Sequence, residues 1–96
     1  MHIRDWPSGE RPREKLLARG AAVLSDAELL ALFLGSGVRG LDAVATARKL
    51  LAGHGPLRRL LELPAAELVK LPGLGPASAC QMGAALELAS RHLAAR

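Results

Sequence analysis

The stretch Leu71-Pro72-Gly73-Leu74-Gly75-Pro76-Ala77-Ser78-Ala79 decides the fold of this chain, because it places a tight turn between two helical segments. A short apolar segment precedes it at residues 64–70, and a long alanine-rich segment follows it. The two glycines allow a positive φ or a close approach of the backbone to another molecule. Pro76 suits the first position of a helix, where a backbone N–H would be unpaired anyway. The sequence therefore predicts two helices joined by a hairpin, over about residues 65–92.

The free amides at the start of the second helix predict an anion site. The N–H groups of Gly75, Ala77 and Ser78 would lie at the positive end of the helix dipole, where phosphate groups bind. The pattern resembles the helix-hairpin-helix (HhH) motif, which generally holds the backbone of a nucleic acid without reading its bases. The alternative interpretation is a tight corner between two helices that binds nothing.

The candidate DNA-phosphate-binding residues combine the hairpin with basic side chains near it in the sequence. They are Gly73, Gly75, Ala77, Ser78, Lys70, Arg58 and Arg59. Ala77 counts against this hypothesis, because many DNA-binding HhH motifs carry Lys or Arg there. Without a cationic side chain at this position, phosphate binding is weaker and depends less steeply on the salt concentration. A further hypothesis places a monovalent cation on the carbonyls of Val69, Leu71 and Leu74, as in some DNA-bound HhH motifs.

The composition indicates a single all-α domain spanning residues 1–96. Half of the 96 residues are apolar, chiefly Leu and Ala, which are good helix formers. Only 2% are aromatic, which nearly excludes the base-stacking platforms of single-strand-binding domains. Thirteen basic and nine acidic side chains give a net charge of +4. This charge suits a polyanion partner, but it is also typical of an ordinary solvated surface.

The hydrophobic pattern predicts a small five-helix domain of the (HhH)2-like type. Besides the short apolar segment that opens the hairpin, helices are expected at residues 12–18, 26–34, 41–52, 57–61 and 76–93. Ser25-Asp26-Ala27-Glu28 is a capping box, in which Ser25 and Glu28 each accept an N–H from the other's backbone. Leu16 and Leu17 are expected core contacts of the first helix. The last helix carries an apolar stripe expected to face the core, formed by Ala79, Met82, Leu86, Ala89 and Leu93.

A second glycine turn suggests an internal repeat. Gly35-Ser36-Gly37 lies between two helical segments, as Gly73-Leu74-Gly75 does. Residues 25–52 would then be a degenerate first copy of the hairpin unit, and residues 57–61 the connector between paired HhH units. Chance similarity between Leu/Ala-rich helices is the alternative interpretation.

Further motifs precede the hairpin in the chain. They are Ile3-Arg4-Asp5-Trp6-Pro7, Glu10-Arg11-Pro12-Arg13-Glu14-Lys15-Leu16 and Leu24-Ser25-Asp26-Ala27-Glu28-Leu29-Leu30-Ala31. Together with the glycine turn near residue 37 and the Gly-Leu-Gly-Pro hairpin, which leads to Ala85-Leu86-Glu87-Leu88-Ala89, they resemble the N-terminal region of the RadC family (UPF0758). The resemblance covers nearly the whole chain. It implies the HhH-containing domain of a protein labelled as a DNA repair protein, followed by a JAB/MPN-type metalloprotease-like domain with a zinc site. In this region Trp6 is expected to pack the N-terminal arm onto the helices.

The sequence carries no catalytic constellation, so we expect this chain to be no enzyme and to need no cofactor. His2, His54 and His92 are scattered without metal-ligand spacing, and Cys80 is the only cysteine. The longest apolar run, residues 29–34, is too short to cross a membrane, and the N-terminus has no signal-peptide core. A cytoplasmic protein without a membrane partner is therefore expected.

Two functions fit the sequence. The first is a non-sequence-specific DNA-binding module of a RadC-like repair-type protein, acting through the hairpin. The alternative is a protein-interaction or scaffold domain that docks on a JAB/MPN-type hydrolase domain or on another partner. The modest net charge of +4 and the alanine at Ala77 favour the alternative.

Overall fold

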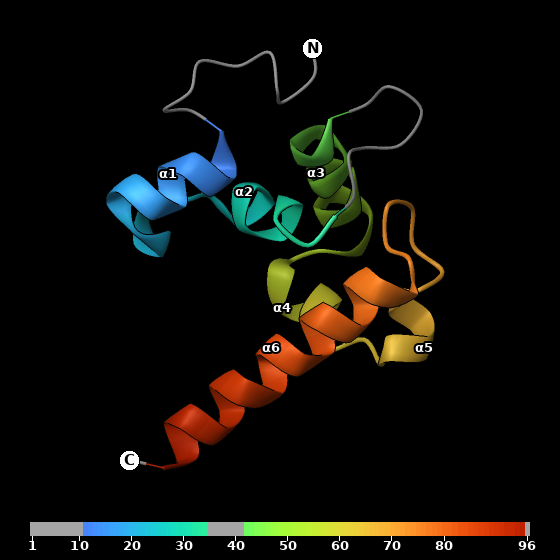
Figure 1. The fold of residues 1–96 in the computed structure, drawn as a ribbon. Helices are drawn as coiled ribbons and strands as arrows, with labels where there is room; N and C mark the ends of the chain where they lie inside the picture. The colour runs from blue at the N-terminus through green and yellow to red at the C-terminus, as the bar shows by residue number, and fades with distance from the viewer. Residues whose placement is uncertain (1–10, 35–41, 96) are drawn as a thin grey trace.

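The computed structural model describes residues 11–34 and 42–95, and in these ranges the chain is helical without any strand (Figure 1). The predicted all-α class is therefore confirmed. The elements are α1 (Pro12–Arg19), the 3-10 helix η3 (Ala21–Val23), α2 (Asp26–Ala31), α3 (Ala43–His54), α4 (Leu57–Leu61), α5 (Ala65–Leu68) and α6 (Pro76–Ala94). These ranges contain six α-helices rather than five, because α5, the short helix predicted to open the hairpin, stands in addition to the five other predicted helices.

One apolar core joins α2 to α6. The largest fully buried side chains are Val44 of α3, Leu60 of α4, Leu68 of α5 and Met82 of α6. Helix α3 packs against both α2 and α4, and α6 packs against α5. Leu and Ala fill most of this core, and small alanine side chains let the helix backbones approach closely. The hairpin is therefore part of the same packed unit as the preceding helices.

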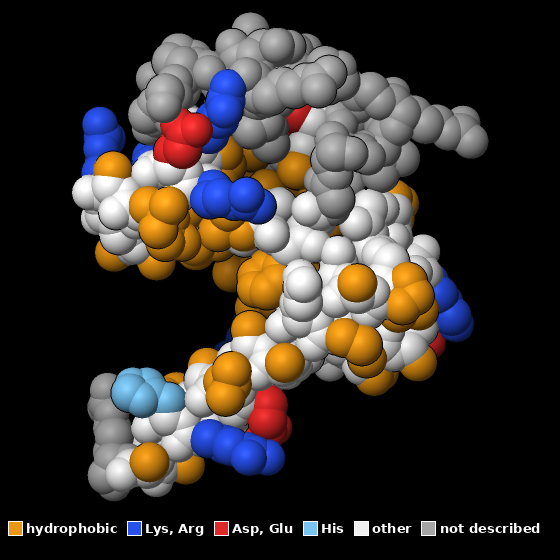
Figure 2. Space-filling view, in the orientation of Figure 1, with side chains coloured by type: hydrophobic (Ala, Val, Ile, Leu, Met, Phe, Trp, Pro, Cys, Tyr) orange, Lys and Arg blue, Asp and Glu red, His pale blue; other side chains and the backbone are white. Residues whose placement is uncertain are grey.

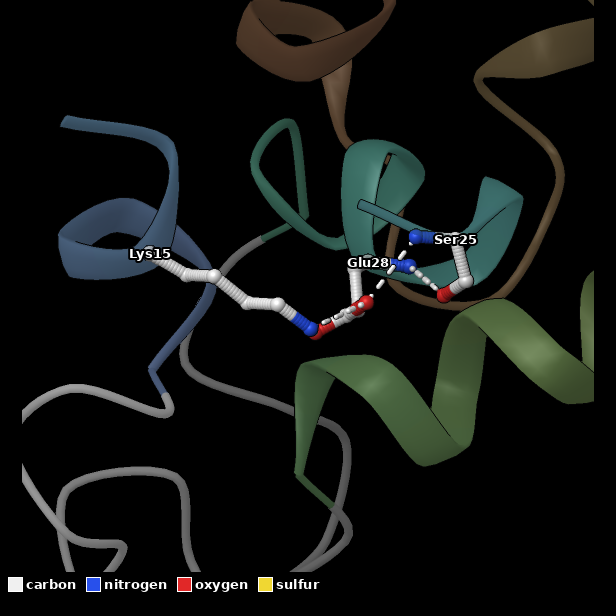
Figure 3. A network of polar contacts seen from close by, with 3 residues as sticks. All are labelled: Lys15, Ser25 and Glu28. Carbon is white, nitrogen blue, oxygen red and sulfur yellow. Dashed lines mark hydrogen bonds and ion pairs between the residues drawn. The ribbon is translucent and has the colours of Figure 1, made fainter. Parts of the chain in front are cut away.

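A polar network ties α1 to the start of α2 (Figure 3). Ser25 Oγ accepts from the N–H of Glu28 at 3.1 Å, and Glu28 Oε1 accepts from the N–H of Ser25 at 2.9 Å. The predicted capping box is thus confirmed. Lys15 of α1 donates to the Glu28 carboxylate, with Nζ 3.1 Å from Oε2. The Ser25 N–H, and then the Lys15 ammonium, hold the pKa of Glu28 below its ordinary value of 4.5, although partial burial opposes this shift.

Two helix ends differ from the prediction for local reasons. Helix α2 ends at Ala31 and not near Leu34, because the next three N–H groups donate to carbonyls three residues back and tighten the chain into turns. Helix α3 begins at Ala43, since Asp42 caps it by accepting the N–H of Ala45 at 2.7 Å. The sequence interpretation missed this cap, although an Asp directly before an apolar helical run is a signal for one.

Two expectations about the core are wrong. Leu17 is 78% exposed, and Leu16 beside it is only half-buried. On α6 the apolar stripe is buried at Ala79 and Met82, but Leu93 is 59% exposed. Helical periodicity identifies an apolar face, but it does not say whether another element covers that face.

The proposed first hairpin copy stays a prediction. Its flanking helices α2 and α3 pack against each other, and α4 follows at the position expected for a connector. Its glycine turn at residues 35–37 lies outside the described residues, and so does Trp6 with the N-terminal arm. The paired-HhH topology therefore rests on the second hairpin and on the order of the helices.

Removal of the Glu28 carboxylate should destabilise the domain in a pH-dependent way. We expect Glu28→Ala to lower the free energy of unfolding by about 1 kcal/mol at pH 7, because the N-cap loses its reciprocal bond and Lys15 loses its partner. A carboxylate with a lowered pKa in the folded state stabilises above the unfolded pKa, and this contribution is lost as the pH falls below about 4.5. Urea denaturation at pH 7 and pH 3 should show the difference from the wild type shrinking at pH 3.

Glu62→Ala is the matched control for this prediction. Glu62 also pairs with a cation, Arg58, at 3.4 Å, but both side chains are largely exposed. Such a pair contributes little, so we expect a change within about 0.5 kcal/mol at either pH. An equal loss in both variants, or a Glu28→Ala effect that does not change with pH, would contradict the role assigned to the capping network.

Candidate nucleic-acid interface

The hairpin between α5 and α6 is built on one β-turn. Leu74 N–H donates to the Leu71 carbonyl at 3.1 Å and closes the turn. Pro72 occupies its second position, and Gly73 occupies its third position with φ +84°. Proline followed by a positive-φ glycine is the pattern of a type II turn. Glycine is therefore required at position 73 by the backbone conformation of the chain itself.

The side chain of Leu74 anchors the hairpin to the core. Only 3% of Leu74 is exposed, and it belongs to the same buried cluster as Leu60, Leu68 and Met82. The sequence interpretation missed this role, although Leu74 is the one apolar side chain between the two glycines. Because this side chain points into the domain, the backbone on either side of it is held at the surface.

Gly75 begins α6 and has a different reason to be glycine. Its φ of −90° and ψ of −177° are extended values that any residue adopts. A Cβ built on it would meet no atom of the described residues within 4 Å. Neither strain nor close packing against residues 11–34 and 42–95 therefore requires glycine at position 75. The missing side chain leaves the backbone open to a group outside the described part of the chain.

The first turn of α6 presents unpaired donors beside Gly75. Pro76 occupies the predicted first helical position, and no side chain caps the helix. Ala79 N–H donates to the Gly75 carbonyl at 3.0 Å and is the first to join the helical ladder. Among the described residues, the N–H groups of Gly75, Ala77 and Ser78 have no hydrogen-bond acceptor. They lie at the positive end of the α6 dipole.

The predicted basic residues fall on two separate elements. Lys70 is exposed in the hairpin segment itself, where its Nζ lies 3.5 Å from Glu67 Oε1. Arg58 and Arg59 lie on α4, and no polar contact of the described residues joins them to the hairpin. Arg59 instead lines an open cavity of about 480 Å³ with His54, Glu62 and Leu63. The structure thus groups Lys70 with the hairpin glycines and leaves the two arginines on another helix.

The described residues give no positive sign of a catalytic or metal site. No three His, Cys, Asp or Glu side chains in this part of the chain come together to hold a metal ion. The monovalent-cation hypothesis concerns the carbonyls of Val69, Leu71 and Leu74, and it stays a prediction. Of these three, the Leu71 carbonyl accepts the turn hydrogen bond from the N–H of Leu74. Cys80 is exposed on α6. None of the helices in the described ranges combines the length and apolar content that a membrane crossing needs.

Comparison with known proteins identifies the family. Residues 3–80 match the family described as UPF0758 N-terminal. The chain belongs to the UPF0758 family. The resemblance to the RadC family noted in the sequence is thereby confirmed. The description of the UPF0758 family names neither a ligand nor a reaction. No solved structure matches the chain.

Relatives in the UPF0758 family are longer than this chain. UPF0758 proteins of Xanthomonas campestris and Xanthomonas oryzae are 76% and 74% identical to it over 93 residues, which cover 97% of this chain and 41% of each relative. A UPF0758 protein of Xylella fastidiosa is 70% identical over 95 residues, which cover 99% of this chain and 42% of the relative. The chain therefore spans about two-fifths of the length of these relatives.

Serine substitutions at Gly73 and Gly75 should have different effects on the stability of the domain. Gly73→Ser should lower the free energy of unfolding by about 1–2 kcal/mol, because a Cβ is strained at φ +84°. Gly75→Ser should leave stability unchanged or raise it by a few tenths of a kcal/mol, because serine is a favoured N-cap and the space there is open. Urea denaturation of both variants measures this contrast. Equal losses at the two positions would contradict the assignment of Gly75 as structurally dispensable.

Proposed function

We propose that this UPF0758 chain is a DNA-binding module that holds the phosphate backbone through its second hairpin and reads no sequence. The observation that carries the proposal is Gly75, a glycine that the fold of the described residues does not require. Glycine at such a position allows the backbone to approach a bulky group closely. The donors beside Gly75 make a phosphate oxygen the group that fits best.

The hairpin presents backbone amides, and few charged side chains, to a phosphate group. The N–H groups of Gly75, Ala77 and Ser78 would donate to phosphate oxygens, and the α6 dipole favours the negative charge. Lys70, in the same hairpin segment, adds a flexible cation. Its exposed pair with Glu67 is weak enough to be exchanged for a phosphate contact. Arg58 and Arg59 on α4 would add charge at longer range, without direct contact to the same phosphate.

The surface of the hairpin favours contact with the backbone of DNA and not with its bases. Sequence is read by side chains that reach base edges, mainly long polar ones such as Arg, Lys, Asn and Gln. From the turn to the first residues of α6, the exposed residues are Pro72, Gly75, Pro76 and Ala77, which carry no such group, and Lys70 lies before the turn. Contacts restricted to phosphate give weak binding, with a dissociation constant on the order of 10⁻⁴–10⁻⁶ M at physiological salt. In a RadC-type repair protein, such a module would bring the rest of the polypeptide to DNA.

An acidic side chain at Gly75 should weaken DNA binding strongly without unfolding the domain. Asp is a favoured N-cap residue, so the carboxylate introduced by Gly75→Asp should accept hydrogen bonds from the free amides. Its negative charge should also repel a phosphate group. We expect at least about a tenfold weaker affinity for a short duplex at low salt, measured by fluorescence anisotropy. Gly83→Asp is the matched control, because Gly83 is an exposed α6 glycine with open space around it and the charge change is equal. Equal weakening in both variants would show that only net charge matters.

A lysine at Ala77 should strengthen binding. Ala77 is exposed in the first turn of α6, where an ammonium group would reach the same phosphate region. We expect Ala77→Lys to steepen the slope of log affinity against log salt by about 0.9, the value for one added phosphate contact. Ala84→Lys adds the same charge at an exposed position further along α6. The proposal predicts little change of slope for Ala84→Lys, and equal slopes for the two variants would count against the hairpin as the contact point.

A further inference from the structure

Helix α6 continues well beyond the body of the domain. Its C-terminal half stands clear of the other helices in Figure 1, and Figure 2 shows a hollow between it and the layer formed by α1 and α2. The apolar stripe of α6 continues without a break along this projecting half. Ala79 and Met82 of the stripe are 0% and 2% exposed, whereas Leu86 and Leu93 are 36% and 59% exposed. Ala89, between them on the same stripe, is exposed as well.

The far side of the hollow is also apolar. Helices α1 and η3, which lie across the hollow from the projecting half of α6, carry the exposed side chains Leu17 and Val23. Figure 2 shows hydrophobic atoms along the side of the α1–α2 layer that borders the hollow. Exposed apolar side chains thus occur on the elements at both sides of the hollow. Neighbouring exposed apolar side chains of this kind mark an interaction site more often than isolated ones do.

The projecting half of α6 has few stabilising contacts of its own. Most helical stability in proteins comes from tertiary packing, and a short helical segment alone is marginal in water. Residues 83–94 have one ion pair between described residues, in which Arg91 Nε lies 2.9 Å from Glu87 Oε2. Such an exposed pair contributes little to stability. The segment would therefore be stabilised by any partner that covers its stripe.

The length of the relatives indicates what this partner is. The match to X. campestris covers 41% of that relative, so more than half of its polypeptide lies outside the matched part. The matched family is the N-terminal one, which places most of the remainder after α6. Helix α6 ends at Ala94, next to the exposed Leu93. In the longer proteins the following segment therefore leaves the domain at the end of the uncovered stripe.

A tethered segment fits this surface better than a free second copy does. A stable interface between separate proteins uses roughly 20–30 residues on each side. The uncovered stripe offers three apolar residues, Leu86, Ala89 and Leu93, and α1 and η3 add the exposed Leu17 and Val23. A segment of the same chain needs far less contact, because a short linker gives it an effective concentration in the millimolar range.

We propose that the stripe of Leu86, Ala89 and Leu93 is an intramolecular docking surface in the longer UPF0758 proteins. The polypeptide that follows α6 folds back into the hollow and covers the stripe, so that the C-terminal half of α6 becomes the core of the contact between the two parts. This inference is independent of the hairpin and of its proposed phosphate contact, since the two surfaces lie at opposite ends of α6.

Hydrogen exchange tests the proposal. The sample is this chain continued by the polypeptide that follows the match in the X. campestris relative, and the reference is the 96-residue chain alone. We expect amide exchange in residues 84–94 to slow by about tenfold in the longer chain, as for a docked state populated about nine-tenths of the time. A second pair of samples is the natural X. campestris protein and a fragment of it that ends where the match to this chain ends. This pair gives the same comparison without joining sequences from two different proteins.

Charged variants on opposite faces of α6 give the control. Leu93→Glu places a charge on the stripe and should remove the added protection of residues 84–94 in the longer chain. Leu88→Glu places the same charge on the other face of the helix, where Leu88 is 69% exposed, and should leave the protection in place. Unchanged exchange in both the fused and the natural pair, or equal loss in the two variants, overturns the proposal. A dimer of the 96-residue chain in sedimentation that Leu93→Glu dissociates also overturns it, because the occupant is then a second copy.

Discussion

Burial of Leu74 is the constraint on which the candidate site depends. A leucine moved from water into the core contributes about 1.5–3 kcal/mol, which offsets part of the entropy lost in ordering the turn. Because Leu74 points inward at 3% exposure, the backbone around Gly73 and Gly75 is fixed at the surface. The amide donors at the start of α6 are thus positioned by apolar packing. No polar side chain of the hairpin is needed to position them.

That packing depends in turn on helices far from the hairpin in sequence. Leu74 shares its buried cluster with Leu60 of α4 and Val44 of α3. Helix α3 packs on α2, and the Lys15–Glu28 pair ties α2 to α1. The core is made of Leu, Ala, Val and Met, so each contact is small and many must be formed together. A small domain buries a limited share of its surface, and loosening of one end is therefore expected to reach the hairpin.

Local signals in the sequence predicted the helix starts well. The capping box at Ser25 and the start of α6 at Pro76 depend on neighbouring residues only, and both are confirmed. Burial depends on distant elements, and here the sequence was less informative. Leu17, an expected core contact, and Leu93, on the apolar stripe of α6, are exposed among the described residues, while Leu74 lies in a turn and is nevertheless buried. The hairpin could therefore be located from the sequence, but the side chain that anchors it could not.

Helix α6 places its two surfaces at a fixed separation. Its 19 residues span about 28 Å at 1.5 Å per residue, with the free amides at one end and the exposed stripe toward the other. If the following polypeptide packs against Leu86 and Leu93, it also stabilises the projecting half of the helix. A continuous helix would then hold that polypeptide at a set distance from the hairpin, and from a phosphate bound there. Docking would in this way determine where the rest of a longer UPF0758 protein lies relative to DNA, without any contact between that region and the hairpin.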